Sequence, residues 1–462
     1  MGVRVRMSGP HHRVLEEHLF PGDGKEAVAF ALCGQHVGPT ATVLLVQRIH
    51  LVPYAHCTRA PDALEWSTDE LEGVLAEAAR ENLSVLKVHS HPGGFEGFSV
   101  ADDQSDAEVF GAVRNWTRSS SPHASLVMLP GGSMFGRAFV DGESTGPVEG
   151  IAVAGDDLHF WDRGVCAEDV PEFALRHGQV FGEGTTNLLR RRTIGVAGCS
   201  GTGSPLIEQL GRYGPGRIVL VDPEPVEEVN LGRIVNASRE DADRGRPKVE
   251  VQGRALGRMG LGTSVELVPH ELSDPEAIRA LAGCDIIFGC VDSVEGRHLL
   301  SLIATCFVQP YLDVGVHITA DGDGGVSEVC GAVHYLHPGG ATLLGREVYS
   351  REDLEADVLS RSAPEEFARR RREGYLHGVR GARPAVVSVN SLYSSFAAIE
   401  LLARLHPFRA KPNRGYACLY LDLVTGLLLP QPEPEVPCEL AHLIGMGGTE
   451  PLLGLPALRA SA

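Results

Sequence analysis

The sequence has no long apolar run, since no stretch of about 18 consecutive hydrophobic residues occurs anywhere in its 462 residues. Its first residues, MGVRVRMSGPHHRVLEE, also lack the apolar core of a signal peptide. The ten cysteines are widely spaced and form no CxxC pair, which does not fit a secreted disulfide framework. We therefore expect a cytoplasmic protein with reduced thiols and no membrane segment.

Positive charge is scarce as well. The chain carries 41 Lys and Arg against 60 Asp and Glu, so broad binding to nucleic-acid phosphates is not expected. With 43% hydrophobic and 22% charged residues, the composition is that of a folded protein and not of a disordered one. One hydrophobic core does not support a chain of this length, so we expect two or three domains.

The hydrophobic periodicity predicts an α/β protein. Segments 41–52 and 84–91 alternate as strands do, and segment 68–83 has the pattern of an amphipathic helix. We place a mixed α/β domain at residues 1–147 and a linker with a helix at 148–175. From 176 to 462 buried strand segments alternate with helices, which predicts a doubly wound parallel sheet.

The first domain contains a candidate metal site in the stretch HSHPGGFEGFSVAD. His89 and His91 are two residues apart, so on a strand they point to the same face and can share one ion. Asp102 follows a Gly-rich turn that can bring it back as a third ligand. Three protein ligands leave a fourth position open, which is typical of catalytic zinc.

Two further residues complete this chemistry. Ser99 can donate a hydrogen bond to the oxyanion of a tetrahedral intermediate. Glu26 stands at the head of an apolar segment and can act as the general base toward water at the metal. We expect Asp103 and Asp106 to be solvated residues of a helix start, where negative charge suits the helix dipole, and not ligands.

These residues resemble the signature of the JAMM/MPN metalloproteases, which is an upstream Glu, His-x-His, seven residues, Ser, two residues and Asp. The chain matches it throughout with Glu26, His89, His91, Ser99 and Asp102. The resemblance implies a cytidine-deaminase-like fold. It also implies zinc-dependent cleavage of peptide or isopeptide bonds after the C-terminal Gly of a ubiquitin-like protein.

The second domain opens with a candidate nucleotide site. The segment GCSGTG, Gly198 to Gly203, follows a strand and begins a helix, so its amides can approach phosphates. Asp222 ends the next strand, where a carboxylate can hold ribose hydroxyls. An NAD-dependent dehydrogenase explains these features equally well. Further along, two cations and a second acidic residue suit ATP with Mg²⁺ better, namely Arg233, Lys248 and Asp292.

Residues 172–405 resemble the ThiF/MoeB and ubiquitin-activating adenylyltransferases, whose pattern is G-x-G-G-x-G, Asp, N-L-x-R, K-x-E and C-x-D. Ser200 departs from the second Gly of the loop. The resemblance implies that Gly198, Gly201 and Gly203 form a phosphate loop and that Asp222 contacts the ribose. It also implies phosphate contacts from Asn230, Arg233 and Lys248, and a Mg²⁺ ligand in Asp292. One further phosphate contact is implied for Arg176 in the segment RHGQVFG.

Two features of such enzymes are missing or unclear. Many relatives bind a structural zinc with two CxxC pairs, but this chain has Thr342 and Gly345 in the first pair and only Cys438 in the second. We therefore expect no second zinc. For a thioester step, Cys306 reads as a core residue, whereas Cys330, Cys418 and Cys438 are candidates for exposed thiols.

Together the two resemblances imply a bifunctional enzyme that cleaves after the C-terminal Gly of a ubiquitin-like protein and adenylates that C-terminus. The implied cofactors are one zinc ion and ATP with Mg²⁺, and the implied assembly is a homodimer. The pathway stays open between a bacterial conjugation system, with antiviral defence as one role, and sulfur-carrier activation. A conjugating enzyme or a sulfur donor is the corresponding partner. A non-catalytic scaffold is the alternative from another class.

Overall fold

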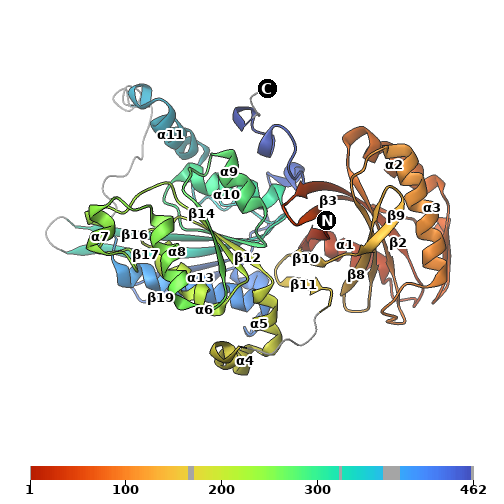
Figure 1. Cartoon of the computed structure of the whole chain (residues 1–462), viewed down its shortest axis with the longest axis horizontal. Coiled ribbons are helices and arrows are strands. Elements are labelled where there is room, and N and C mark those ends of the chain that lie inside the picture. Colours follow the sequence, from red (N-terminus) through yellow and green to blue (C-terminus); the bar gives the residue numbers. More distant parts are fainter. Residues whose placement is uncertain (1, 165–170, 322–324, 368–384, 459–462) are drawn as a thin grey trace. The chain divides into compact units, whose positions relative to one another are not determined.

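The computed structural model describes residues 2–164, 171–321, 325–367 and 385–458. The chain divides into two compact units (Figure 1). Unit 1 comprises Met1–Cys166, Thr305–Val308 and Leu443–Ala462, and unit 2 comprises Ala167–Ala304 and Gln309–His442. Among the described helices, none is both long and apolar enough to cross a membrane.

Unit 1 is built on a nine-stranded mixed sheet with the order β11-β10-β1-β3-β2-β6-β7-β8-β9. A separate small sheet pairs β4 with β5. The strands are β1 (Gly2–Ser8), β2 (Val28–Val37), β3 (Ala41–Leu51), β4 (Cys57–Arg59), β5 (Leu64–Trp66), β6 (Ser84–Ser90), β7 (His123–Met128), β8 (Met134–Val140), β9 (Glu143–Pro147), β10 (Gly150–Ala154) and β11 (Leu158–Asp162). The helices are α1 (Gly9–Leu19), α2 (Asp69–Glu81) and α3 (Val100–Thr117).

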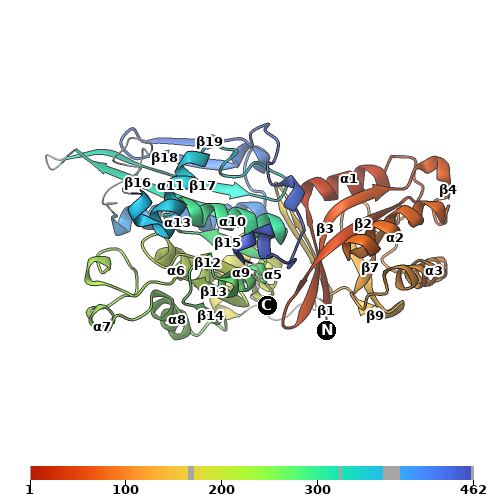
Figure 2. The ribbon, with the colours of Figure 1, turned by 90° about the horizontal axis from the view of Figure 1, so that it is seen from above.

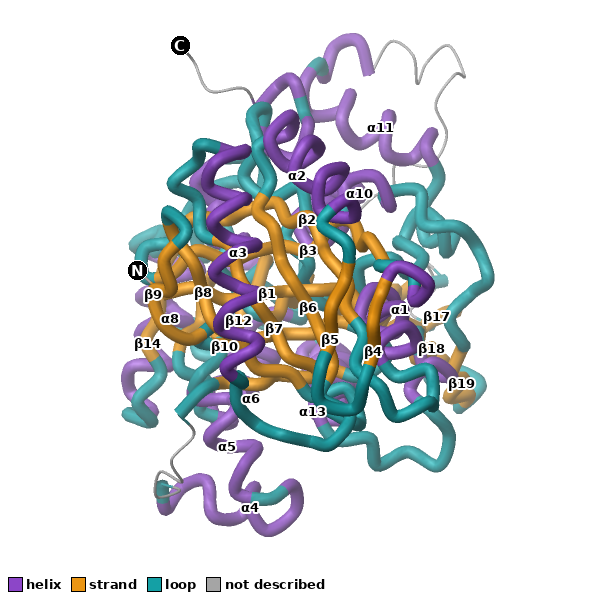
Figure 3. Tube along the Cα trace, turned by 90° about the vertical axis from the view of Figure 1, so that its right-hand side faces the viewer, coloured by secondary structure: helices purple, strands orange, loops and turns teal. Residues whose placement is uncertain are grey.

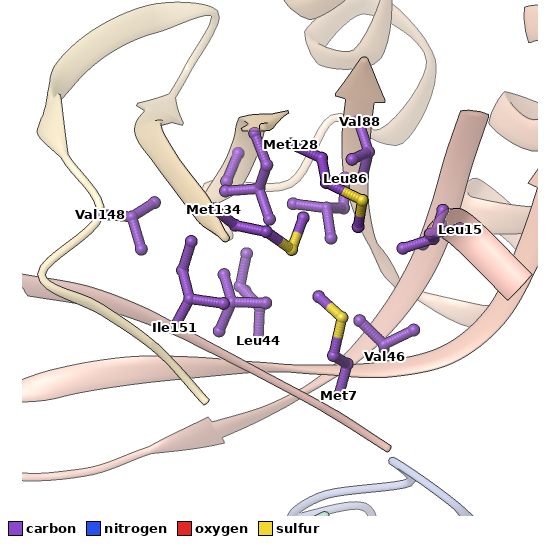
Figure 4. Packing of buried hydrophobic residues seen from close by; sticks show 14 of the residues in the cluster. Met7, Leu15, Leu44, Val46, Leu86, Val88, Met128, Met134, Val148 and Ile151 are labelled. Atoms are coloured by element: carbon purple, nitrogen blue, oxygen red, sulfur yellow. The ribbon is translucent and has the colours of Figure 1, made fainter. Parts of the chain in front are cut away.

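Both faces of this sheet are buried, because side chains alternate along each strand. On one face Leu44 and Leu86 pack in a cluster with Leu15 of α1 (Figure 4). On the opposite face Phe30 and Val85 pack in a second cluster with residues of α2 and α3, which cover it (Figure 3). The side chains of β6 that alternate with Leu86 therefore point toward α3.

Unit 1 extends beyond the boundary that we expected at residue 147. Strand β10 pairs with the otherwise open edge of β1, and β11 pairs with β10. The segment Leu443–Ala462, which we assigned to the second domain, also belongs to unit 1. There Gly448 N donates to Gln35 O at 2.9 Å, and Gln35 forms a parallel bridge with Gly447.

Unit 2 is built on an eight-stranded sheet with the order β14-β13-β12-β15-β16-β17-β18-β19, which Figure 2 shows from above. The strands from β14 to β16 are parallel, and those from β16 to β19 are antiparallel. They are β12 (Thr193–Ala197), β13 (Arg217–Val221), β14 (Ser264–Val268), β15 (Ile286–Gly289), β16 (Tyr311–Ala320), β17 (Val326–Leu336), β18 (Cys418–Asp422) and β19 (Leu427–Gln431).

Helices lie on both faces of this second sheet, with α6, α8 and α13 on one side and α9 and α10 on the other (Figure 1). The helices are α4 (Leu175–Phe181), α5 (Glu183–Arg190), α6 (Gly203–Tyr213), α7 (Arg239–Asp243), α8 (Lys248–Met259), α9 (Pro275–Ala282), α10 (Val294–Cys306), α11 (Arg351–Ser362) and α13 (Val387–Leu405). This arrangement confirms the expected doubly wound α/β fold for the strands from β14 to β16. The predicted all-parallel sheet is wrong for β17 to β19, which are antiparallel because connections too short for a crossover helix join β16 to β17 and β18 to β19. The connections leaving β12 and β15 diverge, and such a switch point is where these sheets bind ligands.

Candidate functional site

The structure brings the three predicted zinc ligands together in unit 1. His89 is the last residue of β6 whose side chain points toward α3. His91 follows the strand, and Asp102 lies in the first turn of α3. The two Nε2 atoms are 3.1 Å apart, and Asp102 oxygens lie 2.9 Å from His89 Nε2 and 3.5 Å from His91 Nε2. Ligands at zinc-nitrogen distances of about 2.0–2.1 Å in a tetrahedron are about 3.3 Å apart, so this donor set fits a zinc ion.

The surrounding contacts prepare these imidazoles for a metal. His91 Nδ1 donates to Phe95 O at 2.8 Å, which leaves the lone pair of its Nε2 free to face the site. Burial lowers the pKa of His89, which favours the neutral form of its ring. Burial also acts to lower the pKa of His91, but its hydrogen bonds to Asp102 and Phe95 outweigh burial and raise that pKa. The two Nε2 atoms that meet at 3.1 Å can act as electron-pair donors toward one cation once neither carries a proton.

Asp102 is held by Ser99 through a capping box at the start of α3. The Ser99 amide and hydroxyl donate to Asp102 Oδ2 at 2.7 and 2.8 Å, and the Asp102 amide donates to the Ser99 hydroxyl at 3.1 Å. The structure therefore places the Ser99 hydroxyl on a ligand carboxylate. To serve an oxyanion, this hydroxyl must first turn away from Asp102.

Glu26 precedes β2, and Val28, two residues further along the chain, is paired with His89 of β6. Burial raises the pKa of Glu26 to about 7, against the opposing charge of His91, while the Asp102 carboxylate raises it further. A carboxylate with this pKa is matched to proton transfer near neutral pH. The structure also shows what positions it: Ala27 N donates to Ser90 Oγ at 3.0 Å, and Ser90 N donates to Ala27 O at 3.1 Å.

Asp106 contradicts our expectation of a solvated residue. Its side chain is buried and ion-paired with Lys87 at 2.7 Å and with Arg137 at 2.7 Å. Asp103 is exposed, although it too contacts Arg137. Ser90, Lys87 and Arg137 are the residues near this site that sequence reasoning missed. The available signal was Lys87 itself, because an inward-facing lysine in a buried strand requires a partner.

In unit 2 the Gly-rich segment forms a tight loop between β12 and α6. Gly198 has φ +91°, and a Cβ atom on it would lie 2.5 Å from Cys290 O. A Cβ atom on Gly203 would lie 1.8 Å from Gly198 O, and one on Gly201 would lie 2.5 Å from Asn390 Nδ2. Gly198 and Gly203 therefore require glycine, because their Cβ atoms would meet backbone atoms, whereas the Asn390 side chain opposite Gly201 can move aside. The N-terminus of α6 follows directly, as an anion site requires.

Asp222 lies beside this loop, directly after β13. Its Oδ2 accepts from Cys199 N at 2.7 Å, and its Oδ1 accepts from Glu224 N at 2.9 Å. Burial raises its pKa, while the Lys248 charge opposes the shift. Each carboxylate oxygen keeps a lone pair for a further donor, such as a ribose hydroxyl.

The structure places the other predicted contacts at varying distances from the loop. Lys248 is buried at the start of α8 and forms an ion pair with Glu224, the residue bonded to Asp222. A Cβ atom on Gly201 would lie 3.6 Å from Arg233 Cδ, so Arg233 borders the loop. The remaining three are a buried Asn230 that accepts from Glu227 N, an exposed Asp292 after β15, and an exposed Arg176 on α4.

The cysteine predictions have mixed outcomes. Cys306 is buried as expected, and burial raises its pKa to about 12. Cys418 is also buried, so its interpretation as an exposed thiol is wrong; it lies on β18 between two paired strands, and burial raises its pKa to about 11. Cys330 and Cys438 are half-buried, and Cys166 lies outside the described residues.

Hydrogen bonds connect the two segments in which relatives bind a structural zinc, the one with Thr342 and Gly345 and the one with Cys438. The Thr342 hydroxyl donates to Glu439 and accepts from Gly345 N at 3.2 Å. Next to them Arg346 Nη2 forms an ion pair with Glu433 at 2.6 Å. Polar side chains link the two segments here.

Comparisons with known proteins bear on unit 2. The ThiF family model matches residues 175–413. "SAMP-activating enzyme E1" of Haloferax volcanii is 33% identical over 123 residues, which are 27% of this chain and 44% of the relative. "Sulfur carrier protein adenylyltransferase" of Thermus thermophilus is 31% identical over 132 residues, 29% of this chain and 48% of the relative. Mouse "Adenylyltransferase and sulfurtransferase MOCS3" is 34% identical over 106 residues, 23% of each chain.

The matched part of this chain thus spans less than half the length of these curated relatives. Among solved structures, E. coli MccB with ATP has 17% sequence identity and a TM-score of 0.44. That match covers 58% of this chain and 74% of the other.

Proposed function

Because this chain belongs to the ThiF family, we propose that unit 2 adenylates the C-terminal carboxylate of a ubiquitin-like or sulfur-carrier protein. The carboxylate oxygen attacks the α-phosphorus of ATP, an acyl-adenylate forms, and pyrophosphate leaves. The observation that carries this proposal is the loop from Gly198 to Gly203, which has no room for a Cβ atom at its first and last residues and lies between Asp222 and the start of α6.

The residues around the loop have separate roles in this proposal. The loop amides and the α6 N-terminus bind phosphate oxygens, and Asp222 orients the ribose. Arg233 and Lys248 neutralise the charge that develops on the phosphates. For Lys248 to do so, its ammonium group must share or exchange its partner Glu224. Asp292 holds Mg²⁺, and Asn230 and Arg176 add phosphate contacts.

Isotope exchange between ATP and pyrophosphate tests this reaction, with a small carrier protein that ends in Gly-Gly as the acceptor. Lys248→Met should reduce the exchange rate at least tenfold through loss of one charge-assisted hydrogen bond. Lys411→Met, which removes an exposed lysine of the same unit, is the matched control and should exchange at the wild-type rate. Equal rates in both variants would contradict the role of Lys248.

We further propose that unit 1 is a JAMM-type peptidase that cleaves after the C-terminal Gly of the same carrier protein. The converging atoms of His89, His91 and Asp102 support it, since they fit a tetrahedral zinc ion. Zinc held there supplies Lewis-acid chemistry for hydrolysis. Glu26 takes a proton from the attacking water and returns it to the leaving amine. The Ser99 hydroxyl, once released from Asp102, donates to the oxyanion.

Metal analysis and a cleavage assay test this second activity. The wild-type chain should purify with one zinc ion and remove an extension that follows Gly-Gly in a carrier precursor. His89→Ala should lose both properties, whereas His159→Ala, on the exposed side of β11, should keep them. A purified wild-type chain without zinc, and without pyrophosphate release on any carrier, would favour the non-catalytic scaffold.

The order of the two activities separates the remaining pathways. If unit 1 trims a precursor so that unit 2 can activate the new carboxylate, Glu26→Ala should block activation of the extended precursor only. Mass spectrometry of the product then distinguishes a sulfur carrier, which gains a thiocarboxylate, from conjugation to an amine. The ThiF family match favours ATP over NAD at the loop. A homodimer remains part of this proposal, and sedimentation would test it.

A further inference from the structure

Three charged side chains lie beside the metal site without belonging to it, and two of them are buried while the third, Arg137, is half-buried. The side chains of Lys87 and Asp106 are only 3% and 1% exposed and form an ion pair at 2.7 Å. Lys87 Nζ also donates to Ser105 Oγ at 2.8 Å, and Ser125 Oγ donates to Asp106 Oδ1 at 3.1 Å. Burying charges is costly even when they are paired, and apolar residues of similar volume are often at least as stabilising. Fold stability alone therefore does not explain this group.

The position of the pair relates it to the zinc ligands. Lys87 and His89 are two residues apart on β6 and point to the same face, a spacing of about 6.7 Å along a strand. Asp106 and Asp102 are four residues apart on α3, about 6 Å along a helix. The two spacings match, so the Lys87–Asp106 and His89–Asp102 contacts form side by side in one register of α3 against β6.

Arg137 on β8 ties the same helix to the loop that precedes it. Its Nε and Nη2 contact Asp106 Oδ2 at 2.9 and 2.7 Å, and its Nη1 contacts Asp103. Its guanidinium carbon lies 3.9 Å from the ring centre of Phe98, whose ring is 6.4 Å from that of His89. One side chain thus contacts both the start of α3 and the loop that links His91 to Asp102.

We propose that Lys87, Asp106 and Arg137 form a positioning cluster that fixes the register of α3 and so sets the affinity of the site for zinc. The inference rests on the zinc site proposed for unit 1. A shift of α3 by one residue moves its side chains by about 1.5 Å along the axis, which is enough to break ligand geometry. The cluster opposes such a shift at three points: the Lys87 pair, the Arg137 pair and the stack on Phe98.

Zinc affinity, measured by competition with a chromophoric chelator on the full chain, tests the cluster. Arg137→Met removes the link to β8 and leaves the Lys87–Asp106 pair intact. The double variant Lys87→Met, Asp106→Leu replaces the buried pair by apolar residues, which such sites tolerate. Each should bind zinc about 10- to 100-fold more weakly, the loss typical of outer contacts to ligands. The thermal midpoint without metal separates affinity from stability.

Arg48→Met is the matched control, because it removes an arginine that pairs with Glu77 at 2.5 Å and with Glu81 on α2 of the same unit. It should bind zinc with wild-type affinity. Wild-type affinity in a folded double variant would overturn the inference; if that variant does not fold, wild-type affinity in Arg137→Met overturns it. A wild-type chain that binds no zinc would instead refute the proposed peptidase function.

Discussion

Gly203→Ala is the substitution that tests the phosphate loop most directly. The new Cβ atom would lie 1.8 Å from Gly198 O, whereas real Cβ contacts are essentially never under 3.0 Å. The loop and the start of α6 must therefore separate by at least about 1.2 Å. A hydrogen bond of about 2.9 Å stretched by that amount is lost. One charge-assisted bond contributes about 1.5–3 kcal/mol, so MgATP should bind about 10- to 150-fold more weakly.

Isothermal titration of the full chain with MgATP measures this loss. Gly232→Ala is the control, because a Cβ atom on Gly232 would meet no atom within 4 Å although it lies between Asn230 and Arg233. Gly201→Ala should fall between the two, since its collision is with the Asn390 side chain, which can rotate. If Gly203→Ala keeps its circular dichroism spectrum and binds MgATP as tightly as Gly232→Ala, this loop does not bind the phosphates.

Three further outcomes are expected. Glu26→Gln should slow cleavage of a carrier precursor by about 10²–10⁴-fold while its zinc content, measured by mass spectrometry, stays at the wild-type level. In the metal-free chain, burial holds the pKa of Glu26 at about 7, so its carboxylate resonance should titrate there, and added zinc should lower that pKa because a cation favours the charged form. Glu400→Gln should cost about 3–5 kcal/mol in urea unfolding, because it breaks the buried pair with Arg404; a loss below about 1 kcal/mol would contradict that cost.

Local patterns in the sequence were sufficient to predict the strands and turns that hold both sites. His89 lies in β6 and His91 directly after it, two residues apart and therefore on the same face. A Gly-rich turn then reverses the chain and brings Asp102 back to them, so the convergence of these three side chains follows from strand periodicity and one turn. The loop at Gly198 is likewise a local consequence of strand, turn and helix. These features depend on residues close together in the chain.

The errors came from contacts between residues far apart in the chain. Asp106 looked solvated because the first turns of α3 are polar, and only Lys87 on another strand shows that this face is buried. Cys418 looked accessible because its burial depends on strands β17 and β19 on either side. The bridge between Gln35 and Gly447 has no local signature at all. Pairing across such separations depends on the assembled sheet and not on the pattern of one segment.

Because residues 443–462 belong to unit 1, the two units cannot be separated by cutting the gene at one point. In chain order, unit 2 is an insertion within unit 1, and unit 1 is completed only after unit 2 has been synthesised. A gene truncated after residue 166 would therefore encode a first unit without the segment that bonds to Gln35. Dissection of the two proposed activities is better done by point substitution in the intact chain, and a cell that makes this protein makes both units in equal number.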